Sequence, residues 1–543
     1  MRCLVSRQFF LYGISAALAL INTHSPLAND RIIAPKRDYL MTPDVKITSD
    51  GQRVDIERGL IFVPENRNNP NSRTIAVHFI RFPAAQKSAK STPPVFMYPG
   101  GPGEDLNFPG TSTSFDIVQR LRRRRDVVYV SQRGYPDAPG LVPRMNVIGA
   151  VKPTPLDRPA SIERMGQQFA EAYATDLSYW AQRGVDVTGY DINNIASDVY
   201  DLRAALGYDK IILRGSSFAS QLSFYYMKRW PETVDRAMLG GVEPLDYAYD
   251  SPKWLWAAFG RLAAEAEQNT EMAPYIPNGG LMNALETIFI RLENEPVTVD
   301  VIDPNSRKNV QITVGADDLS LVIRQTSMFQ RGDVLANRAV WPRFVIELYN
   351  GDYRSLAIAS LIERANSVAE GPPLMNLLID NSFGISKQRD KLLLAEKTQR
   401  WLKPNWGYRA TRDVLGAAPQ VSQETLKDWD IDLPVLLMAG TYDWFTPSEN
   451  AKHAANFLKN GHLMIVEGAT HSFLFQPKQL TGQYPEIAEA LYSFVDADFS
   501  QTSAASIFAK LPTKVTLAPL AFEVPNGVSL YDEMLMKARN GEN

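Results

Sequence analysis

The sequence predicts an α/β protein with a mostly parallel sheet, helices on both faces of that sheet and one large helical insertion. Short apolar runs, typical of buried strands, recur at residues 94–98, 127–130, 210–213, 234–240, 433–438 and 462–467. Helical patterns, for example at residues 188–206 and 447–458, separate several of these runs as in strand–helix–strand units. Between residues 247 and 430 this alternation stops and helical stretches dominate, which indicates an insertion into the parallel fold.

An antiparallel hairpin is expected at one edge of the sheet. Residues 53–64 and 73–83 alternate apolar and polar side chains, and the Asn- and Pro-rich stretch at 66–72 provides the turn. Helical patterns in the insertion fall at residues 252–268, 281–293, 317–330, 338–349 and 355–367. A last core helix is expected at 485–499, and the residues beyond 501 show no clear pattern.

The chain of 543 residues is longer than one α/β core requires, and its 45% hydrophobic content is typical of a globular protein. We therefore expect one core interrupted by an insertion instead of two independent enzymes. The expected division is a leader at residues 1–28, a first core segment at 29–246, a helical cap at 247–430, a second core segment at 431–500 and a C-terminal extension at 501–543.

A candidate nucleophile lies in the pentad Gly-Ser-Ser-Phe-Ala at residues 215–219. The pentad follows the apolar run at 210–213 and precedes a helical run at 221–228, which is the strand–turn–helix context of a nucleophile elbow. Such a turn strains its central residue, here Ser217, and needs small residues two positions away, here Gly215 and Ala219. Short Gly/Ser turns are common, so the pentad needs support from the rest of the chain.

Two later loops supply an acid and a base in the chain order that such elbows use. Asp443 follows the apolar run at 433–438, and His471 follows the run at 462–467. The two loops are therefore expected side by side at one edge of a parallel sheet. Neutral His is suited to remove the serine proton, and Asp fixes the imidazole tautomer. The alternative is an Asp that caps a turn and a His that is only solvated, but no other histidine beyond the leader lies in a post-strand loop.

A glycine-rich loop after the run at 94–98 completes the candidate site. Residues 99–103 read Pro-Gly-Gly-Pro-Gly, and a backbone N–H of Gly100 or Gly101 is expected to join that of Phe218 in an oxyanion hole. Phosphate binding is the alternative use of such a loop. It is disfavoured because the sequence lacks the spacing of a phosphate-binding motif, and Pro102 has no N–H to donate.

These motifs together resemble the proline iminopeptidase / tripeptidyl aminopeptidase family of α/β-hydrolases. The resemblance rests on the Gly-Gly-Pro-Gly loop, the Ser-Gln-Arg-Gly sequence at 131–134, the elbow, and a Gly-Thr-x-Asp sequence before a late histidine, and it spans residues 56–494. The chain has Pro99 where family members carry His, and Ser131 where they commonly carry Asp. It also lacks the cysteines that the secreted tripeptidyl branch often has in its cap.

The resemblance implies an α/β-hydrolase core with a large helical cap, and a serine peptidase that forms an acyl-enzyme on Ser217. The expected activity is that of an aminopeptidase, which releases residues or short peptides from a free N-terminus. Glu243, soon after the strand at 234–240, is a candidate to bind the substrate amino group. An esterase, lactonase or amidase acting on a non-peptide substrate is the leading alternative, and a catalytically silent binding protein is the third. The aromatic residues that either line a substrate pocket or pack in the cap core are Tyr247, Tyr249, Trp254, Trp256 and Phe259.

The first residues have the pattern of a secretion signal. Arg2 and Arg7 flank the start of an apolar stretch at 9–21 that is short for a membrane span, and cleavage is expected after Ala28. The expected location is periplasmic or secreted, with no stable membrane association after cleavage; an uncleaved anchor is the alternative. The only cysteine, Cys3, lies in this leader, so the mature protein is expected to have neither disulfides nor thiol chemistry.

Charge and composition argue against several kinds of partner. The net charge is −3, and loss of the two leader arginines makes it −5, so we expect a peptide or small-molecule substrate and no nucleic-acid partner. The basic run at 120–125 is interpreted as a helix end, where cations interact favourably with the helix dipole. The sequence contains no His-Glu-x-x-His motif and no Cys/His cluster, and we expect neither a metal nor another cofactor. The sequence does not predict the oligomeric state.

Overall fold

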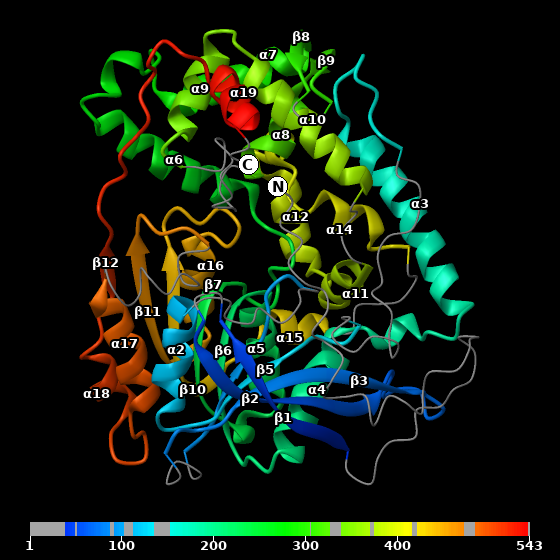
Figure 1. Cartoon of the computed structure of the whole chain (residues 1–543), viewed down its shortest axis with the longest axis vertical. Coiled ribbons are helices and arrows are strands. Elements are labelled where there is room, and N and C mark those ends of the chain that lie inside the picture. Colours follow the sequence, from blue (N-terminus) through cyan, green and yellow to red (C-terminus); the bar gives the residue numbers. More distant parts are fainter. Residues whose placement is uncertain are drawn as a thin grey trace.

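The computed structural model describes residues 38–48, 51–86, 92–102, 112–134, 152–303, 306–325, 338–369, 374–414, 421–471 and 484–540. The expected leader at residues 1–28 lies outside these ranges. The molecule has two layers along its long axis, a core built on a large sheet and a cap of helices stacked above it (Figure 1). The long helix α3 (Ile162–Ala181) runs along one side of both layers.

The core sheet has ten described strands. Their order across the sheet is β1 (Tyr39–Ile47), β2 (Arg53–Pro64), β3 (Thr74–Phe82), β5 (Val127–Val130), β4 (Val95–Met97), β6 (Ile211–Ser217), β7 (Val234–Val242), β10 (Ile431–Gly440), β11 (Leu458–Glu467) and β12 (Lys514–Thr516). All neighbours from β5 to β12 are parallel, whereas β1, β2 and β3 pair antiparallel and β3 pairs antiparallel with β5. The carboxyl ends of the parallel strands point toward the cap (Figure 1).

Apolar side chains fill both faces of this sheet. The helices packed on one face are α2 (Ser112–Arg122), α17 (Pro485–Asp496) and α18 (Ala504–Phe508). Those packed on the other face include α4 (Ile192–Ala205), α5 (Phe218–Arg229) and α16 (Ser448–Ala455). Burial on both faces explains why the parallel strands are continuous apolar runs. The predicted α/β architecture, with a mostly parallel sheet and helices on both faces, is confirmed.

Several boundaries differ from the prediction, one because of a local helix cap and another because of strand pairing. The predicted helix at 188–206 is a 3-10 turn, η2 (Val187–Gly189), followed by α4, where the side chain of Asp191 caps the helix by accepting from the Asn194 N–H. α16 ends at Ala455, and β11 begins at Leu458 instead of residue 462. Asn460 and Gly461 favour a turn, yet parallel pairing with β10 keeps both in the strand.

The edge of the sheet also differs from the prediction. The predicted hairpin forms as β2 and β3, but β1 pairs with β2 along its length and is the edge strand. None of the β1 side chains is fully buried, which is common for an edge strand and explains why its sequence shows no clear apolar pattern.

The cap is mainly helical but includes a β-hairpin that the sequence analysis did not predict. Its helices are α6 (Pro252–Gln268), α7 (Leu281–Asn294), α8 (Ala316–Gln325), α9 (Trp341–Tyr349), α10 (Arg354–Ala369), α11 (Leu374–Phe383), α12 (Lys387–Ala395), α13 (Gln399–Leu402), α14 (Trp406–Thr411) and α15 (Gln423–Lys427), with the short turn η4 (Ala273–Tyr275) after α6. The hairpin pairs β8 (Val297–Ile302) with β9 (Asn309–Val314) in antiparallel register. The hairpin contributes three fully buried side chains to the apolar cluster of the cap: Val301, Ile312 and Val314. It therefore packs against the cap helices through one face.

The cap aromatics resolve into core and partly exposed positions. Phe259 is fully buried; its ring stacks on Trp341 at 5.7 Å between centroids and lies 4.6 Å from the ring of Trp444. Phe259 therefore packs in the cap core. Tyr247 and Tyr249 are also buried, whereas Trp256 is only partly buried against that core.

The C-terminal extension joins the two layers. It adds β12 to the far edge of the sheet, and then α19 (Leu530–Asn540) packs on the cap. Arg343 of α9 forms an ion pair with Glu533 of α19 at 2.9 Å, and the Tyr531 hydroxyl accepts from the Ile302 N–H at 2.9 Å. The extension is therefore an integral part of the fold, although its sequence gave no pattern that predicted this.

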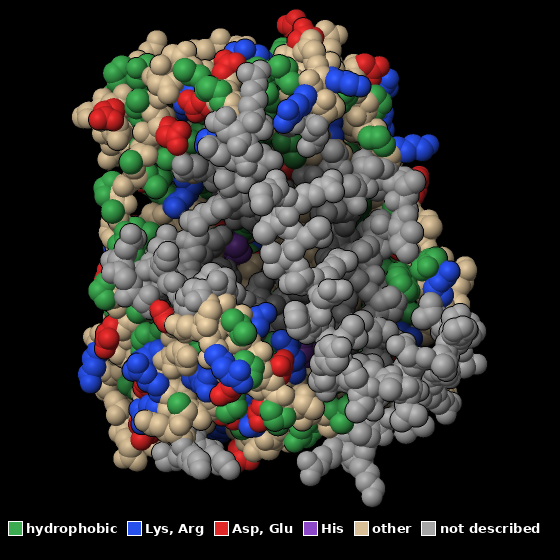
Figure 2. Space-filling model, viewed as in Figure 1, with side chains coloured by type: hydrophobic (Ala, Val, Ile, Leu, Met, Phe, Trp, Pro, Cys, Tyr) green, Lys and Arg blue, Asp and Glu red, His purple; other side chains and the backbone are tan. Residues whose placement is uncertain are grey.

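The surface view in Figure 2 shows basic and acidic side chains mixed over both the upper and the lower part of this face. Within the ranges that the structure describes, no helix combines the length and the apolar character needed to cross a membrane.

Truncation of Leu530 tests the anchoring of the cap by α19. Leu530 is fully buried in the cap cluster, so Leu530→Ala should lower the free energy of unfolding by about 2–5 kcal/mol through lost burial and a residual cavity. Met536 lies on the same helix and is 47% exposed, so Met536→Ala is the matched control with a change within about 0.5 kcal/mol. Urea denaturation measures both. Equal losses in the two variants would contradict this packing.

Candidate active site

The end of β6 has the geometry of a nucleophile elbow. Ser217 is the last residue of β6 and precedes α5, and its backbone adopts φ 59° and ψ −137°. A positive φ is uncommon for a residue with a side chain and is strained, and it persists only where surrounding structure enforces it. The turn places Ser217 between a central strand and a helix N-terminus, as the pentad predicted.

The small residues around the elbow are in direct contact. A Cβ atom placed on Gly215 would lie 2.5 Å from the carbonyl oxygen of Ala219 and 3.0 Å from its Cβ. Real atoms do not approach that closely, so any larger residue at 215 would open the turn. This explains in physical terms why the pentad carries Gly and Ala at these positions.

Asp443 and His471 form a hydrogen-bonded pair at the neighbouring strand ends. His471 Nδ1 lies 2.9 Å from Asp443 Oδ2, and the Asp443 carboxylate is almost fully buried. A carboxylate can only accept, so Nδ1 carries the proton and Nε2 keeps its lone pair. An imidazole held in this tautomer can act as a general base through Nε2.

The Asp443 carboxylate is also held by its own loop. One oxygen accepts the N–H groups of Phe445 at 2.9 Å and Thr446 at 2.8 Å. The other accepts the Thr446 hydroxyl at 2.6 Å in addition to the imidazole. Thr441 connects the loop of Asp443 to the loop of His471, because its hydroxyl accepts the N–H of Gly468 at 2.9 Å.

The imidazole of His471 lies beside the elbow. A Cβ placed on Gly241, near the end of β7, would lie 3.0 Å from His471 Cε1 and 2.9 Å from Ser216 Oγ. Only glycine therefore lets the His471 ring approach the residue before Ser217. Among the described residues no hydrogen bond joins Ser217 to His471, and the Ser217 hydroxyl instead donates to Glu243 Oε1 at 3.5 Å.

The glycine loop lies at the same edge of the sheet. β4, which precedes Gly100 and Gly101, pairs parallel with β6, with Met97 opposite Arg214. Phe218 is the first residue of α5, and its N–H is one of the helix N-terminal donors without an intrahelical acceptor. The structure thus brings the predicted oxyanion donors to the strand end that carries Ser217.

Glu243 is placed next to Ser217 by the elbow helix. The Ser220 hydroxyl donates to the Ser217 carbonyl at 2.7 Å and accepts the Glu243 N–H at 2.9 Å. Gln221 adds a second tie, because its side-chain amide donates to the carbonyls of Pro244 at 3.0 Å and Leu245 at 3.3 Å. The carboxylate of Glu243 is therefore held within reach of the candidate nucleophile.

Acidic side chains from the cap approach Glu243. Burial raises the pKa of Glu243 well above its ordinary value, and the charges of Asp250, Asp380 and Asp443 raise it further. Asp380 lies on α11, and burial raises its own pKa although Tyr408 of α14 donates a hydrogen bond to it. The residues beside the candidate nucleophile therefore carry an excess of carboxyl groups from both layers.

Sequence reasoning missed several of these residues. Thr446, Asp250, Asp380 and Tyr408 are ordinary polar residues in the sequence, and only the fold brings them to the site. Gln132, whose amide donates to the carbonyls of Pro99 and Gly100, was also missed. It lies in the Ser-Gln-Arg-Gly sequence on which the family resemblance rests, and that motif was the signal that could have drawn attention to it.

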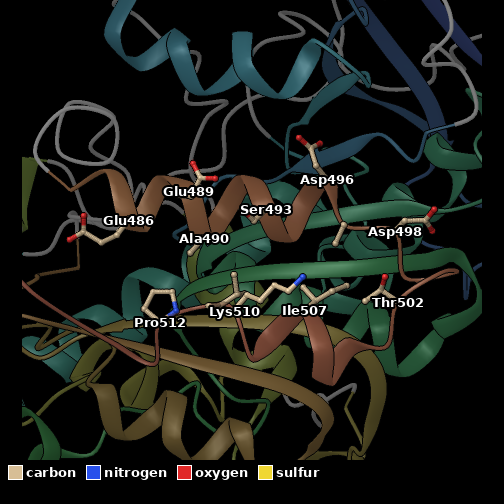
Figure 3. A pocket seen from close by; sticks show the side chains of 12 residues that line it. Glu486, Glu489, Ala490, Ser493, Asp496, Asp498, Thr502, Ile507, Lys510 and Pro512 are labelled. Carbon is tan, nitrogen blue, oxygen red and sulfur yellow. The ribbon is translucent and has the colours of Figure 1, made fainter.

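A separate hollow of about 570 Å³ lies between α17 and residues 497–512. Figure 3 shows Glu489 and Asp496 extending from the side of α17 that faces away from Lys510 and Thr502. Asp496 is also paired with Arg125 at 2.7 Å. The hollow contains none of the predicted site residues. No group of three or more His, Cys, Asp or Glu side chains suited to a metal occurs in the ranges that the structure describes.

Comparisons with known proteins agree with this fold. Residues 93–278 match the family model described as alpha/beta hydrolase fold, and residues 408–480 match the model described as TAP-like protein. Serine protease Hip1 of Mycobacterium tuberculosis and of Mycobacterium bovis is 22% identical over 463 residues, which cover 78% of this chain and 83% of the relative.

Solved structures are similar at lower identity. A bromoperoxidase from Bacillus anthracis is 14% identical with a TM-score of 0.34, covering 81% of this chain and 100% of that chain. A hydrolase from Pseudomonas aeruginosa PA01 is 13% identical with a TM-score of 0.31, covering 81% of this chain and 98% of that chain.

The sheet order, the covering helices and the family match define an α/β-hydrolase fold. The chain is a hydrolase of this fold and a distant homologue of serine proteases. The match to the TAP-like model and the similarity to serine protease Hip1 both support a relationship to α/β-hydrolase peptidases.

Asp443→Asn tests the Asp–His pair. The amide would present an N–H to a loop that already donates three hydrogen bonds to this side chain, and the imidazole would lose its preferred tautomer. We expect a folded variant whose kcat falls about 10⁴-fold. Asp432 is exposed at the start of β10, the strand that precedes the Asp443 loop. Asp432→Asn is therefore the matched control and should keep full activity. Initial rates and circular dichroism check both, and an unchanged rate in Asp443→Asn would assign the acid elsewhere.

Proposed function

We propose that this protein is an exported serine aminopeptidase that releases residues or short peptides from free N-termini. The carrying observation is the carboxylate of Glu243 at 3.5 Å from the Ser217 hydroxyl, with further acidic side chains around it. A buried carboxylate among like charges gains most from a cationic partner. When a single N-terminal residue is released, the substrate ammonium lies next to the bond to be cleaved and supplies that charge.

In this proposal Ser217 is the nucleophile. His471 Nε2 takes the hydroxyl proton as Ser217 attacks the scissile carbonyl, and Asp443 stabilises the resulting imidazolium. The N–H groups of Phe218 and of Gly100 or Gly101 stabilise the negative charge on the carbonyl oxygen. His471 then protonates the leaving amine, and water, deprotonated by His471, hydrolyses the acyl-enzyme.

The proposed proton transfer needs a change at Ser217. Its hydroxyl donates to Glu243 in the substrate-free protein, so it must rotate to donate to the imidazole. An ammonium that binds Glu243 competes for that carboxylate and releases the hydroxyl. Substrate binding and activation of the nucleophile are thereby coupled in this proposal.

The proposed specificity is tested with matched chromogenic substrates. Free-amine mono-, di- and tripeptide anilides are compared with their acetylated twins and with one short p-nitrophenyl ester. Turnover of the free-amine peptides alone supports the aminopeptidase, and the preferred length defines the exopeptidase class. Faster turnover of the ester would favour an esterase, lactonase or amidase, and no turnover of any substrate would favour a binding protein.

Glu243→Gln separates amine recognition from the chemistry. Loss of the negative charge should raise KM for free-amine peptides at least about tenfold, because a charge-assisted hydrogen bond is replaced by a neutral one. The acetylated peptide, which has no ammonium, should show the opposite trend or no change. Glu424→Gln, exposed on α15, is the control and should leave both rates unchanged. Equal losses on both substrates would contradict amine recognition by Glu243.

The same variant makes a prediction for stability. The pKa of Glu243 is raised in the folded protein, so the folded state holds this proton more tightly than the unfolded chain does, and stability is lost as the pH rises from the unfolded-state pKa of about 4.3 toward the folded-state pKa. Glu243→Gln should therefore raise the melting temperature at neutral pH, and this gain should vanish as the pH falls below about 4. Thermal unfolding across this pH range measures it. A lower melting temperature at neutral pH would show that the ionised group stabilises the fold.

Export rests on the leader pattern of the sequence. Arg2, Arg7 and the apolar stretch at 9–21 support cleavage after Ala28 and a periplasmic or secreted mature protein. Cell fractionation followed by N-terminal sequencing tests this part independently of the activity. A mature chain that still begins at residue 1 would contradict it.

A further inference from the structure

Gln132 connects the loop after β5 to the glycine loop after β4. Its side-chain amide donates to the carbonyl of Pro99 at 3.2 Å and to the carbonyl of Gly100 at 3.1 Å, and the residue is 2% exposed. One NH₂ group thus binds two successive carbonyls of the loop that was assigned to the oxyanion hole. This contact involves neither Ser217 nor the Asp443–His471 pair.

The direction of these two carbonyls fixes the direction of two N–H groups. In a planar trans peptide the C=O and the N–H point to opposite sides. The Pro99 carbonyl shares its peptide with the Gly100 N–H, and the Gly100 carbonyl shares its peptide with the Gly101 N–H. Because Gln132 binds both carbonyls, the N–H groups of Gly100 and Gly101 face away from it.

The order of the strands shows toward which neighbouring strand the Gly100 and Gly101 N–H groups point. β4 lies between β5 and β6, so Gln132 follows the strand on one side and Ser217 ends the strand on the other. N–H groups that point away from Gln132 therefore point toward the β6 side. That is the side on which the acyl oxygen would develop its charge in the proposed reaction.

Gln132 is itself held rigidly by its neighbours. The N–H of Ser131 donates to the His78 carbonyl at 2.9 Å. The guanidinium of Arg133 has no exposed surface and pairs with both oxygens of Asp198, at 2.7 and 2.6 Å. Arg133 also donates to the carbonyl of Gly189 at 2.7 Å and to those of Glu65 and Pro64. A side chain with all its donors used in this way anchors the turn to three separate segments.

We propose that Gln132 is the positioning residue of the oxyanion loop: it orients the Gly100 and Gly101 N–H groups toward the acyl oxygen, and Arg133 anchors it. This inference rests on the proposed function, because it assumes acyl transfer to Ser217. It also gives the Ser-Gln-Arg-Gly sequence a physical role. Gln132 restrains the described part of this loop, because it binds the carbonyls of both Pro99 and Gly100.

Gln132→Met is the test, because it keeps the volume and removes both donors. The loop N–H groups should lose their fixed direction, which weakens only interactions made in the transition state. We expect kcat to fall about 10- to 100-fold on the best substrate of the panel, with KM within about twofold. The Ki of a peptide boronate or trifluoromethyl ketone, which forms a tetrahedral adduct at Ser217, should rise by the same factor as kcat/KM falls.

Gln221→Met is a matched control, since Gln221 is also a buried glutamine whose amide donates to two carbonyls. It removes the same kind of bonds but from the loop beside Glu243, so KM and the inhibitor Ki should shift together. The ratio of inhibitor Ki to KM is thus the readout that a merely structural role would not move. An unchanged ratio in Gln132→Met would overturn the proposal.

Two further variants make each outcome decisive. If Gln132→Met does not fold, Gln132→Glu keeps the shape and places a carboxylate against two carbonyl oxygens, and the same change in ratio is expected. Ser217→Ala is measured in parallel, with an expected loss of about 10⁶ in kcat. An inactive Ser217→Ala with unaltered Gln132 variants would overturn only this inference. An active Ser217→Ala would overturn the proposed function and this inference with it.

Discussion

The strained backbone of Ser217 is the constraint on which the arrangement of the site depends. A residue with φ 59° at the end of a central strand costs about 1–3 kcal/mol and must be enforced by its surroundings. Gly215 and Ala219 enforce it from below by close contact, and β4 and β7 do so from either side. Ser220 transmits the same constraint to the next loop, because its hydroxyl bridges the carbonyl of Ser217 and the N–H of Glu243. The candidate nucleophile Ser217 and the carboxyl group of Glu243 are thus positioned by one turn.

The loop that carries Asp443 is held jointly by the core and by the cap. Asp443 lies between Tyr442 and Trp444, and both of these aromatic side chains are buried in the cap cluster. Arg261 of α6 donates to the Thr441 carbonyl at 2.7 Å, and the Tyr442 hydroxyl bonds to Glu265 on the same helix. The acid therefore follows a core strand but takes its final position from cap side chains. A cap tied in this way positions the loop of Asp443, which in turn forms a hydrogen bond with His471.

The sequence predicted those parts that depend on local chemistry. An elbow must have small residues at fixed positions, and parallel strands buried on both faces must be apolar, so the strand–turn–helix at Ser217 and the core sheet could be predicted. β1 and the β8–β9 hairpin were not predicted, because β1 has no fully buried side chain and so no apolar pattern, and the short hairpin lies in a region where helical patterns dominate. Thr446 and Asp380 have no local signature either, and their meaning comes only from what the fold places next to them. Gln132 was visible as a motif, but its role required the position of the Pro99 and Gly100 carbonyls.

Charge links Asp443, Glu243 and the proposed substrate. Asp443 serves the His471 imidazole, and its negative charge also contributes to the raised pKa of Glu243. A protonated Glu243 can still accept the Ser217 hydroxyl through its carbonyl oxygen, whereas an ionised Glu243 requires a nearby cation. In the proposed reaction the substrate ammonium is that cation, and the imidazolium that forms later neutralises Asp443 in turn. A neutral ester brings no such charge and leaves Glu243 protonated next to the nucleophile. The preference for a free N-terminus would then arise from electrostatics at Ser217 itself, and it would persist despite the Pro99 and Ser131 departures from the family pattern.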